Sequence, residues 1–179
     1  ISGLTNITNI ACGKGHSIFL RSDGIVYACG YNYYGQLGLG NTNSTSTPTL
    51  ISNLNNINIT NIACAYLHTL FLTDNGQVYG CGYNENGSLG LGDTNNRDTP
   101  EKINYFIENN IKITKVSCGY SCSIFLDDNG IVYACGYNYY GQLGLGHTNN
   151  RNTPEKINYF IDNNIFIYDI AVSNNAVVG

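Results

Sequence analysis

The feature that most constrains this chain is an internal repeat. The segment from Gly24 to Gly40 recurs without change from Gly130 to Gly146, and a closely similar segment runs from Gly76 to Gly92. A repeat of this length indicates structural units that stack side by side, each covering the hydrophobic face of its neighbour. The chain therefore reads as a single repeat domain over residues 1–179, with units at about 7–58, 59–112 and 113–166 and a partial fourth at 167–179.

Each unit has the pattern of short β-strands. In the first unit, residues 7–12 are apolar at alternate positions and rich in β-branched side chains, and 16–20 and 25–29 follow as further apolar segments. An apolar patch at 36–39 is the candidate for a fourth strand, before a long connector that contains Pro48. The pattern predicts four-stranded antiparallel units.

Turn signals separate these segments. Asp23-Gly24 is typical of a tight hairpin, and the later units have Asn75-Gly76 and Asn129-Gly130 at the same place. No window keeps the apolar spacing of a long helix, although residues 102–107 can form one helical turn.

The units share a longer pattern: an apolar residue, Cys-Gly, His followed by Ser or Thr, an Asp/Asn-Gly turn, Val-Tyr and Gly-Gln-Leu-Gly. It covers residues 10–40, 62–92 and 116–146, with departures at Ala65, Ser88 and Cys122. This pattern resembles the regulator-of-chromosome-condensation repeat. Where that family often has Trp before a Gly, this chain has Cys29, Cys81 and Cys135, so we expect Phe19, Phe71 and Phe125 to supply the missing bulk.

The resemblance implies an all-β fold made of β-propeller blades. Three four-stranded antiparallel blades and one extra strand, residues 170–178, would form part of a larger ring, which usually has seven blades in this family, or of an oligomeric ring. Three blades cannot close, because propellers need about four to eight. We expect either that the chain is a segment of a longer protein or that copies join edge to edge, and that the isolated polypeptide is not a stable monomer.

Composition narrows the function. The formal net charge is −4 and Lys and Arg form no cluster, which argues against direct binding of nucleic acid. No apolar run approaches the length of a membrane span, so no membrane contact is expected.

Six of the seven cysteines follow the repeat and stand 17 residues apart within each unit, as in Cys12 and Cys29. A whole strand should separate such a pair by about 9–10 Å, beyond the reach of a disulfide. We therefore expect free thiols, which favour an intracellular or reducing compartment. The alternative to free thiols is a metal site, in which Cys12 and His16 or their counterparts in the other units would be ligands. Zinc needs four ligands that converge, and neighbouring units hold their copies apart. Neither a metal nor a cofactor is therefore predicted.

The geometry of a four-stranded meander places the loops after the first and third strands on one face. That face is predicted to be rich in tyrosine and to bind protein, and the opposite face, with Asp23, Asp74, Asp127 and Asp128, is predicted to be acidic. The candidate binding residues are Tyr33, Tyr34, Tyr66, Glu85, Asn86, Tyr120, Tyr139 and Tyr140.

No arrangement of Ser, His and acidic residues indicates catalysis, so the chain is predicted not to be an enzyme. The sequence favours a non-catalytic protein-binding or structural scaffold module that contacts a protein partner or a second copy of itself. The resemblance leaves open a guanine-nucleotide exchange regulator of a small GTPase. The exposed tyrosines leave open a lectin-like binder.

Overall fold

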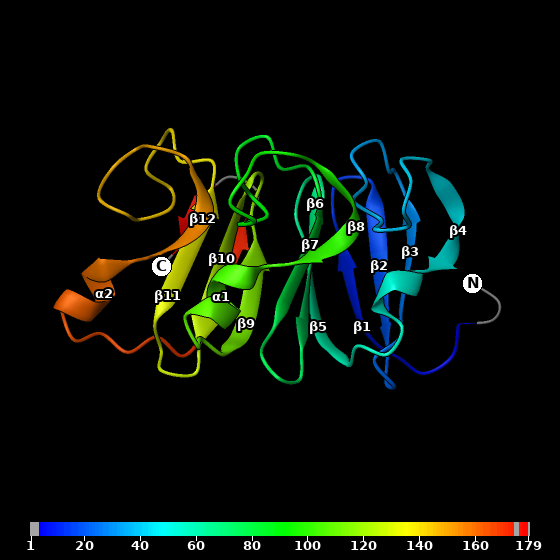
Figure 1. The fold of residues 1–179 in the computed structure, drawn as a ribbon, viewed down its shortest axis with the longest axis horizontal. Coiled ribbons are helices and arrows are strands. Elements are labelled where there is room, and N and C mark those ends of the chain that lie inside the picture. Colours follow the sequence, from blue (N-terminus) through cyan, green and yellow to red (C-terminus); the bar gives the residue numbers. More distant parts are fainter. Residues whose placement is uncertain (1–3, 174–175, 179) are drawn as a thin grey trace.

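Three four-stranded antiparallel sheets make up most of the molecule (Figure 1). The computed structural model describes residues 4–173 and 176–178. Within each sheet the strands pair in chain order, as a blade of a propeller requires. The strands are β1 (Ile7–Cys12), β2 (His16–Arg21), β3 (Val26–Gly30) and β4 (Thr45–Leu50) in the first blade, β5 (Ile59–Cys64), β6 (His68–Thr73), β7 (Val78–Gly82) and β8 (Arg97–Lys102) in the second, and β9 (Ile113–Cys118), β10 (Cys122–Asp127), β11 (Val132–Gly136) and β12 (Arg151–Lys156) in the third.

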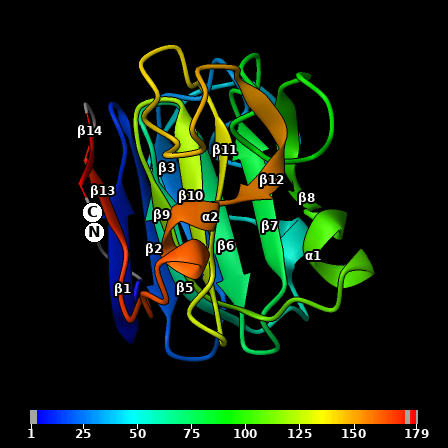
Figure 2. The same ribbon diagram turned by 90° about the vertical axis from the view of Figure 1, so that its left-hand side faces the viewer.

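The blades succeed one another along the long axis of the molecule in Figure 1. The first strands of successive blades, β1, β5 and β9, lie next to each other. Turning the molecule by 90° places β1 toward one side and β8 toward the other (Figure 2). The all-β fold and the blade architecture predicted from the repeat are confirmed.

The first three strands of each blade begin and end close to where the pattern placed them, but the fourth strand was wrong. The patch at 36–39 is a loop whose Leu37 is fully buried, and the fourth strand is 45–50, inside the predicted connector. Burial in a loop explains the apolar signal at 36–39. Pro48 is tolerated in β4 because this strand ends the sheet order and has a free edge.

The hairpins turn at the predicted glycines. Gly24 has φ of +81° and its N–H donates to the carbonyl of Arg21 at 3.0 Å. A side chain is strained at this φ, and a Cβ there would lie 2.6 Å from Asn58 Oδ1 and 3.2 Å from the backbone nitrogen of Ile59, where the second blade begins. The glycine therefore serves both the turn and the approach of two blades.

Short helical turns follow the fourth strands: η1 (Ser52–Leu54), α1 (Asn104–Glu108) and α2 (Asn158–Asp162). The single turn predicted at 102–107 is confirmed by α1, displaced toward its C-terminal end. No helix among residues 4–173 and 176–178 is long and apolar enough to cross a membrane.

The fourth unit differs from the prediction of one extra strand at 170–178. It forms two short strands, β13 (Ala171–Ser173) and β14 (Ala176–Val178), which pair antiparallel with each other. β13 lies beside β9, where the first strand of a fourth blade belongs. Residues 174, 175 and 179 of the predicted segment lie outside the described residues.

Hydrophobic cores lie between blades rather than inside one. Phe71 and Cys81 of the second blade pack against Leu20 and Val26 of the first, and Phe71 is fully buried. Phe125, equally buried, lies in the core between the second and third blades. These two phenylalanines fill the interfaces between the blades.

Two buried histidines link the blades by hydrogen bonds. His16 Nε2 lies 3.0 Å from Thr69 Oγ1 of the second blade, and that hydroxyl donates to the carbonyl of Gln36 at 2.8 Å. The hydroxyl has a single proton, so the ring must donate through Nε2–H, which leaves Nδ1 unprotonated; no hydrogen-bond partner for Nδ1 lies among the described residues. His68 makes the same link to Ser123, at 2.9 Å. The third blade has Cys122 at this register.

Candidate functional site

The loops after the first and third strands lie on the same face of every blade. The longer ones, at 31–44, 83–96 and 137–150, follow β3, β7 and β11 and run along the upper edge of Figure 1. The shorter ones, at 13–15, 65–67 and 119–121, follow β1, β5 and β9. All eight candidate binding residues fall in these loops.

A buried asparagine holds each long loop in shape. Asn32 Nδ2 donates to the carbonyls of Asn41 and Asn43, at 2.8 and 3.1 Å, and its Oδ1 accepts from the N–H of Leu37 at 2.9 Å. Asn84 and Asn138 occupy the same place in the other blades. These hydrogen bonds join residues that are 9 and 11 positions apart in the chain. They hold the backbone of the loop segment that carries Tyr33 and Tyr34.

The tyrosines of the first loop form a continuous aromatic cluster with the second blade. Tyr31 and Tyr33 are parallel with ring centroids 6.4 Å apart, and Tyr33 meets Tyr34 edge-on at 5.1 Å. Tyr34 in turn meets Tyr83 edge-on at 5.2 Å. Tyr33 is 68% exposed, so the cluster presents open ring surface to solvent.

A second aromatic group joins the three short loops. Tyr66 and Tyr120 lie with ring centroids 4.5 Å apart, and Lys14 Nζ stands 4.4 Å from the centroid of Tyr66. The contact with Tyr66 raises the pKa of Lys14, so this lysine is a permanent cation among aromatic rings. Lys14 forms no ion pair within the described residues.

The third blade repeats the first cluster. Tyr137 and Tyr139 are parallel at 6.4 Å and Tyr140 meets Tyr139 edge-on at 5.1 Å, as in the identical sequence of the first loop. Tyr140 is 80% exposed, whereas its counterpart Tyr34 is half-buried against the second blade.

Glu85 and Asn86 replace these tyrosines in the second blade. Asn86 Nδ2 donates to Ser121 Oγ at 3.1 Å and so ties the second blade to the third. The Tyr83 hydroxyl donates to Glu85 at 3.3 Å, and the Glu85 side chain is exposed. Glu85 therefore adds an exposed negative charge to this face.

The sequence prediction missed Tyr31, Tyr83 and Tyr137, which complete the clusters. All three follow a glycine at the end of the third strand, in the repeated triplet Gly-Tyr-Asn. A tyrosine that recurs directly after a strand, in the first residue of an exposed loop, was the available signal.

The acidic rim predicted on the opposite face forms in part, because Asp23, Asp74 and Asp128 are exposed but Asp127 is not. Asp127 is buried and accepts N–H groups from Asn129 and Ile131 at 2.9 and 2.8 Å, so it stabilises its own turn. Asp23 pairs with Arg21 at 2.6 Å. Turn chemistry therefore uses the Asp127 carboxylate, which the sequence pattern assigned to the surface.

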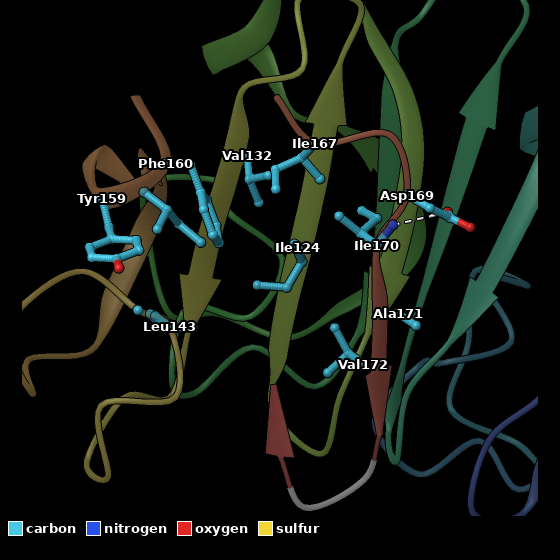
Figure 3. Close-up of a pocket in the computed structure, with 12 residues that line it drawn as sticks. Ile124, Val132, Leu143, Tyr159, Phe160, Ile167, Asp169, Ile170, Ala171 and Val172 are labelled. Atoms are coloured by element: carbon cyan, nitrogen blue, oxygen red, sulfur yellow. Dashed lines mark hydrogen bonds between the residues drawn. The ribbon is translucent and has the colours of Figure 1, made fainter. Parts of the chain in front are cut away.

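A second candidate surface is a pocket of about 370 Å³ on the far side of the third blade (Figure 3). Ile124 and Val132 of the sheet, Phe160 of α2, and Ile170 and Val172 of the partial fourth unit surround it. The equivalent space between the second and third blades is filled by Phe125 and Cys135. The pocket thus corresponds to the space that the second and third strands of the third blade fill at the second blade.

The cysteines are all free thiols. Ser17 stands between Cys12 and Cys29 across the sheet, as predicted from their spacing. Burial raises the pKa of Cys122 to about 11, so this thiol is a poor nucleophile. No group of three or more His, Cys, Asp or Glu side chains is placed to hold a metal ion in the described part of the chain.

Stacked four-stranded meanders with cores between blades define a β-propeller segment. The RCC1-like domain profile matches residues 2–178, and the chain belongs to this family. The ultraviolet-B receptor of Arabidopsis thaliana is 36% identical over 151 residues, which cover 84% of this chain and 34% of the receptor. The X-linked retinitis pigmentosa GTPase regulator of Homo sapiens is 36% identical over 149 residues, which cover 83% of this chain and 14% of that protein. The chain thus spans about a third or less of the length of these relatives.

Solved structures agree on the fold. Prp20p of Saccharomyces cerevisiae, a protein studied for its binding to Gsp1p and histones, superposes with a TM-score of 0.84 at 24% identity, over 96% of this chain and 43% of that one. Yeast RCC1 (Prp20) bound to Kap60 superposes with a TM-score of 0.75 at 26% identity, over 87% of this chain and 37% of that one. RCC1-type repeats, as the sequence pattern indicated, are therefore confirmed.

Proposed function

We propose that this chain is a non-catalytic protein-binding or scaffold module whose tyrosine-rich face contacts a protein partner. The observation that carries the proposal is the concentration of nine of the 15 tyrosines in the loops of one face. Tyrosine offers large, fairly rigid contact area with a polar tip, and it is enriched at the energetic centres of protein interfaces. These residues are Tyr31, Tyr33, Tyr34, Tyr66, Tyr83, Tyr120, Tyr137, Tyr139 and Tyr140.

Charge on this face supports a protein partner over nucleic acid. With histidines taken as neutral, its loops carry only Lys14, Glu85 and Asp93 as formal charges. Nucleic acids draw affinity from several cations placed on phosphates, and one lysine among carboxylates does not supply them.

Affinity capture tests the proposal with a matched control. Replacing Tyr33, Tyr34, Tyr139 and Tyr140 by alanine should abolish capture of a partner that the natural chain retains. A control variant carries alanine at Tyr168, which is 77% exposed but lies outside these loops and outside the pocket beside the third blade. Equal capture by the quadruple variant and the natural chain would refute the role of the face.

The same experiment separates the scaffold from a GTPase regulator, a function that the name of one relative makes relevant. A small GTPase recovered among the captured proteins is loaded with labelled nucleotide. Faster nucleotide release on addition of this chain would overturn the scaffold proposal in favour of nucleotide exchange.

A further inference from the structure

Two hollows on the tyrosine-rich face share Tyr34 as a lining residue. Tyr34 stands edge-on to both Tyr33 and Tyr83, with interplanar angles of 79° and 87°, so it is held as a ridge between them. One hollow, of about 310 Å³, is lined by Lys14, Gly15, Tyr31, Tyr34 and Leu67. The other, of about 320 Å³, is lined by Tyr33, Tyr34, Thr42, Asn96, Arg97 and Asp98.

The aromatic walls of the hollows carry unused hydrogen-bond donors. Among the described residues, the hydroxyls of Tyr31, Tyr33 and Tyr34 make no hydrogen bond, whereas that of Tyr83 donates to Glu85. A ligand that fits here presents apolar surface to the rings and hydrogen-bond acceptors to the hydroxyls.

The charges at the hollows are unequal. Arg97, in the second hollow, is neutralised by Asp93 at 2.6 Å and by Glu101. Lys14, in the first, has no carboxylate partner within residues 4–173 and 176–178, and its Nζ lies 4.4 Å from the centroid of the Tyr66 ring. The first hollow therefore selects for a negative charge on the ligand.

We propose that the two hollows bind a proline-rich segment in the polyproline II conformation, with an acidic residue beside the proline run placed at Lys14. This inference rests on the proposed protein-binding function and names the class of partner. A polyproline II segment has no internal hydrogen bonds, so its carbonyls accept from the tyrosine hydroxyls, and its pyrrolidine rings occupy the hollows between aromatic ridges. Its conformation is already ordered, so little entropy is lost on binding.

Other peptide modes fit these loops less well. An added β-strand needs an exposed sheet edge, and a docked helix needs a long apolar groove. The second hollow includes Arg97 and Asp98 at the start of the outer strand β8, but the Asp98 carbonyl already accepts the N–H of Gly40 at 2.9 Å. Neither hollow is a long apolar groove.

Fluorescence anisotropy with the full chain tests the proposal. The probes are labelled decaproline, decaproline flanked by two glutamates, decaproline flanked by two lysines, and a Gly-Ser peptide of equal length. The glutamate-flanked peptide should bind most tightly and the Gly-Ser peptide should not bind. Tyr34→Ala should weaken binding by about tenfold or more, which corresponds to about 1.4 kcal/mol.

An exposed tyrosine outside the tyrosine-rich loops supplies the control. Tyr168→Ala removes a ring that is 77% exposed but lies in none of these loops, and it should leave affinity unchanged. Lys14→Glu should reverse the preference between glutamate- and lysine-flanked peptides, a result that loss of fold would not produce. Thermal denaturation confirms that each variant is folded.

Three results would overturn the proposal: proline and Gly-Ser peptides bound equally, Tyr34→Ala without effect, or binding of an oligosaccharide, but of no peptide, that depends on Tyr34. If no peptide binds while the quadruple tyrosine variant still loses its captured partner, this inference fails and the proposed function stands. If capture is insensitive to the quadruple variant, the proposed function itself fails.

Discussion

At the scale of single residues, two buried histidines join neighbouring blades by hydrogen bonds. Burial lowers the pKa of His16 to about 4 and that of His68 to about 3, so both rings are neutral near pH 7. Each neutral ring donates one hydrogen bond across an interface and keeps its second nitrogen unprotonated. Protonation would place a charge in a core that offers no acceptor for it.

This arrangement predicts that acid weakens the fold. The unfolded histidines bind protons below about pH 6.5 and the folded ones do not until pH 4 or lower, so stability falls as pH drops through that interval. The free energy of unfolding should decrease by a few kcal/mol between pH 7 and 4.5. His68→Cys, the residue that the third blade has at this register, should flatten the dependence. Urea denaturation at several pH values measures it, and a slope unchanged in the variant would contradict the assignment.

At the scale of elements, the helices α1 and α2 form a natural pair for measuring the contribution of a neighbouring blade. Both share the sequence Asn-Tyr-Phe-Ile followed by an acid. In α1, Phe106 is buried against Phe125 and Tyr133 of the next blade, at centroid distances of 4.9 and 5.7 Å. In α2, Phe160 meets only Tyr159 among the aromatic rings of the described residues.

Truncation should therefore cost very different amounts at the two sites. Phe106→Ala should destabilise the fold by about 3–5 kcal/mol, because it leaves a cavity in a closed core. Phe160→Ala should cost about 1 kcal/mol or less, because its ring is already partly in solvent. Urea denaturation of the two variants measures the difference. Equal losses would show that the helix itself, and not the following blade, supplies the stabilisation.

The same elements show what the sequence could predict. β1 was placed at its observed bounds because alternation and β-branched residues agree there. β4 was missed because a strand with one free edge has little apolar pattern, and the buried Leu37 in the preceding loop gave a stronger signal. Asp127 was assigned to the surface because a single sequence does not reveal that a turn carboxylate bonds its own backbone. The tyrosine-rich face could be predicted because successive loops of an antiparallel meander lie on alternate faces, a property of the topology alone. The function of this face stays a prediction.

At the scale of the whole molecule, the first and third blades differ from the middle one because each has one face that no other complete blade of this chain covers. We call these two surfaces the end faces. Each interior interface buries a phenylalanine of one blade against the sheet of the preceding blade. At the third blade, β13 covers part of the sheet, and the pocket of about 370 Å³ beside Phe160 remains open. At the first blade, Ile10 is 57% exposed where its counterpart Ile62 is buried. Apolar surface is therefore concentrated at both ends of the array.

These faces predict that the 179-residue polypeptide associates with itself in solution. Burial of the apolar end faces stabilises an associated form by about 25 cal/mol for each Å² of apolar surface removed from water. Because the blades are repeats, the two end faces correspond to the two sides of an interface between blades, so the end of one copy can pack against the opposite end of another. Sedimentation velocity should show species heavier than 19.5 kDa whose proportion rises with concentration. Phe160→Asp, which places a charge at the pocket, should shift the distribution toward the monomer. Tyr139→Asp, on the tyrosine face, should leave the distribution unchanged. A monodisperse mass near 19.5 kDa with a cooperative thermal transition would show that the end faces are stable in water as they stand.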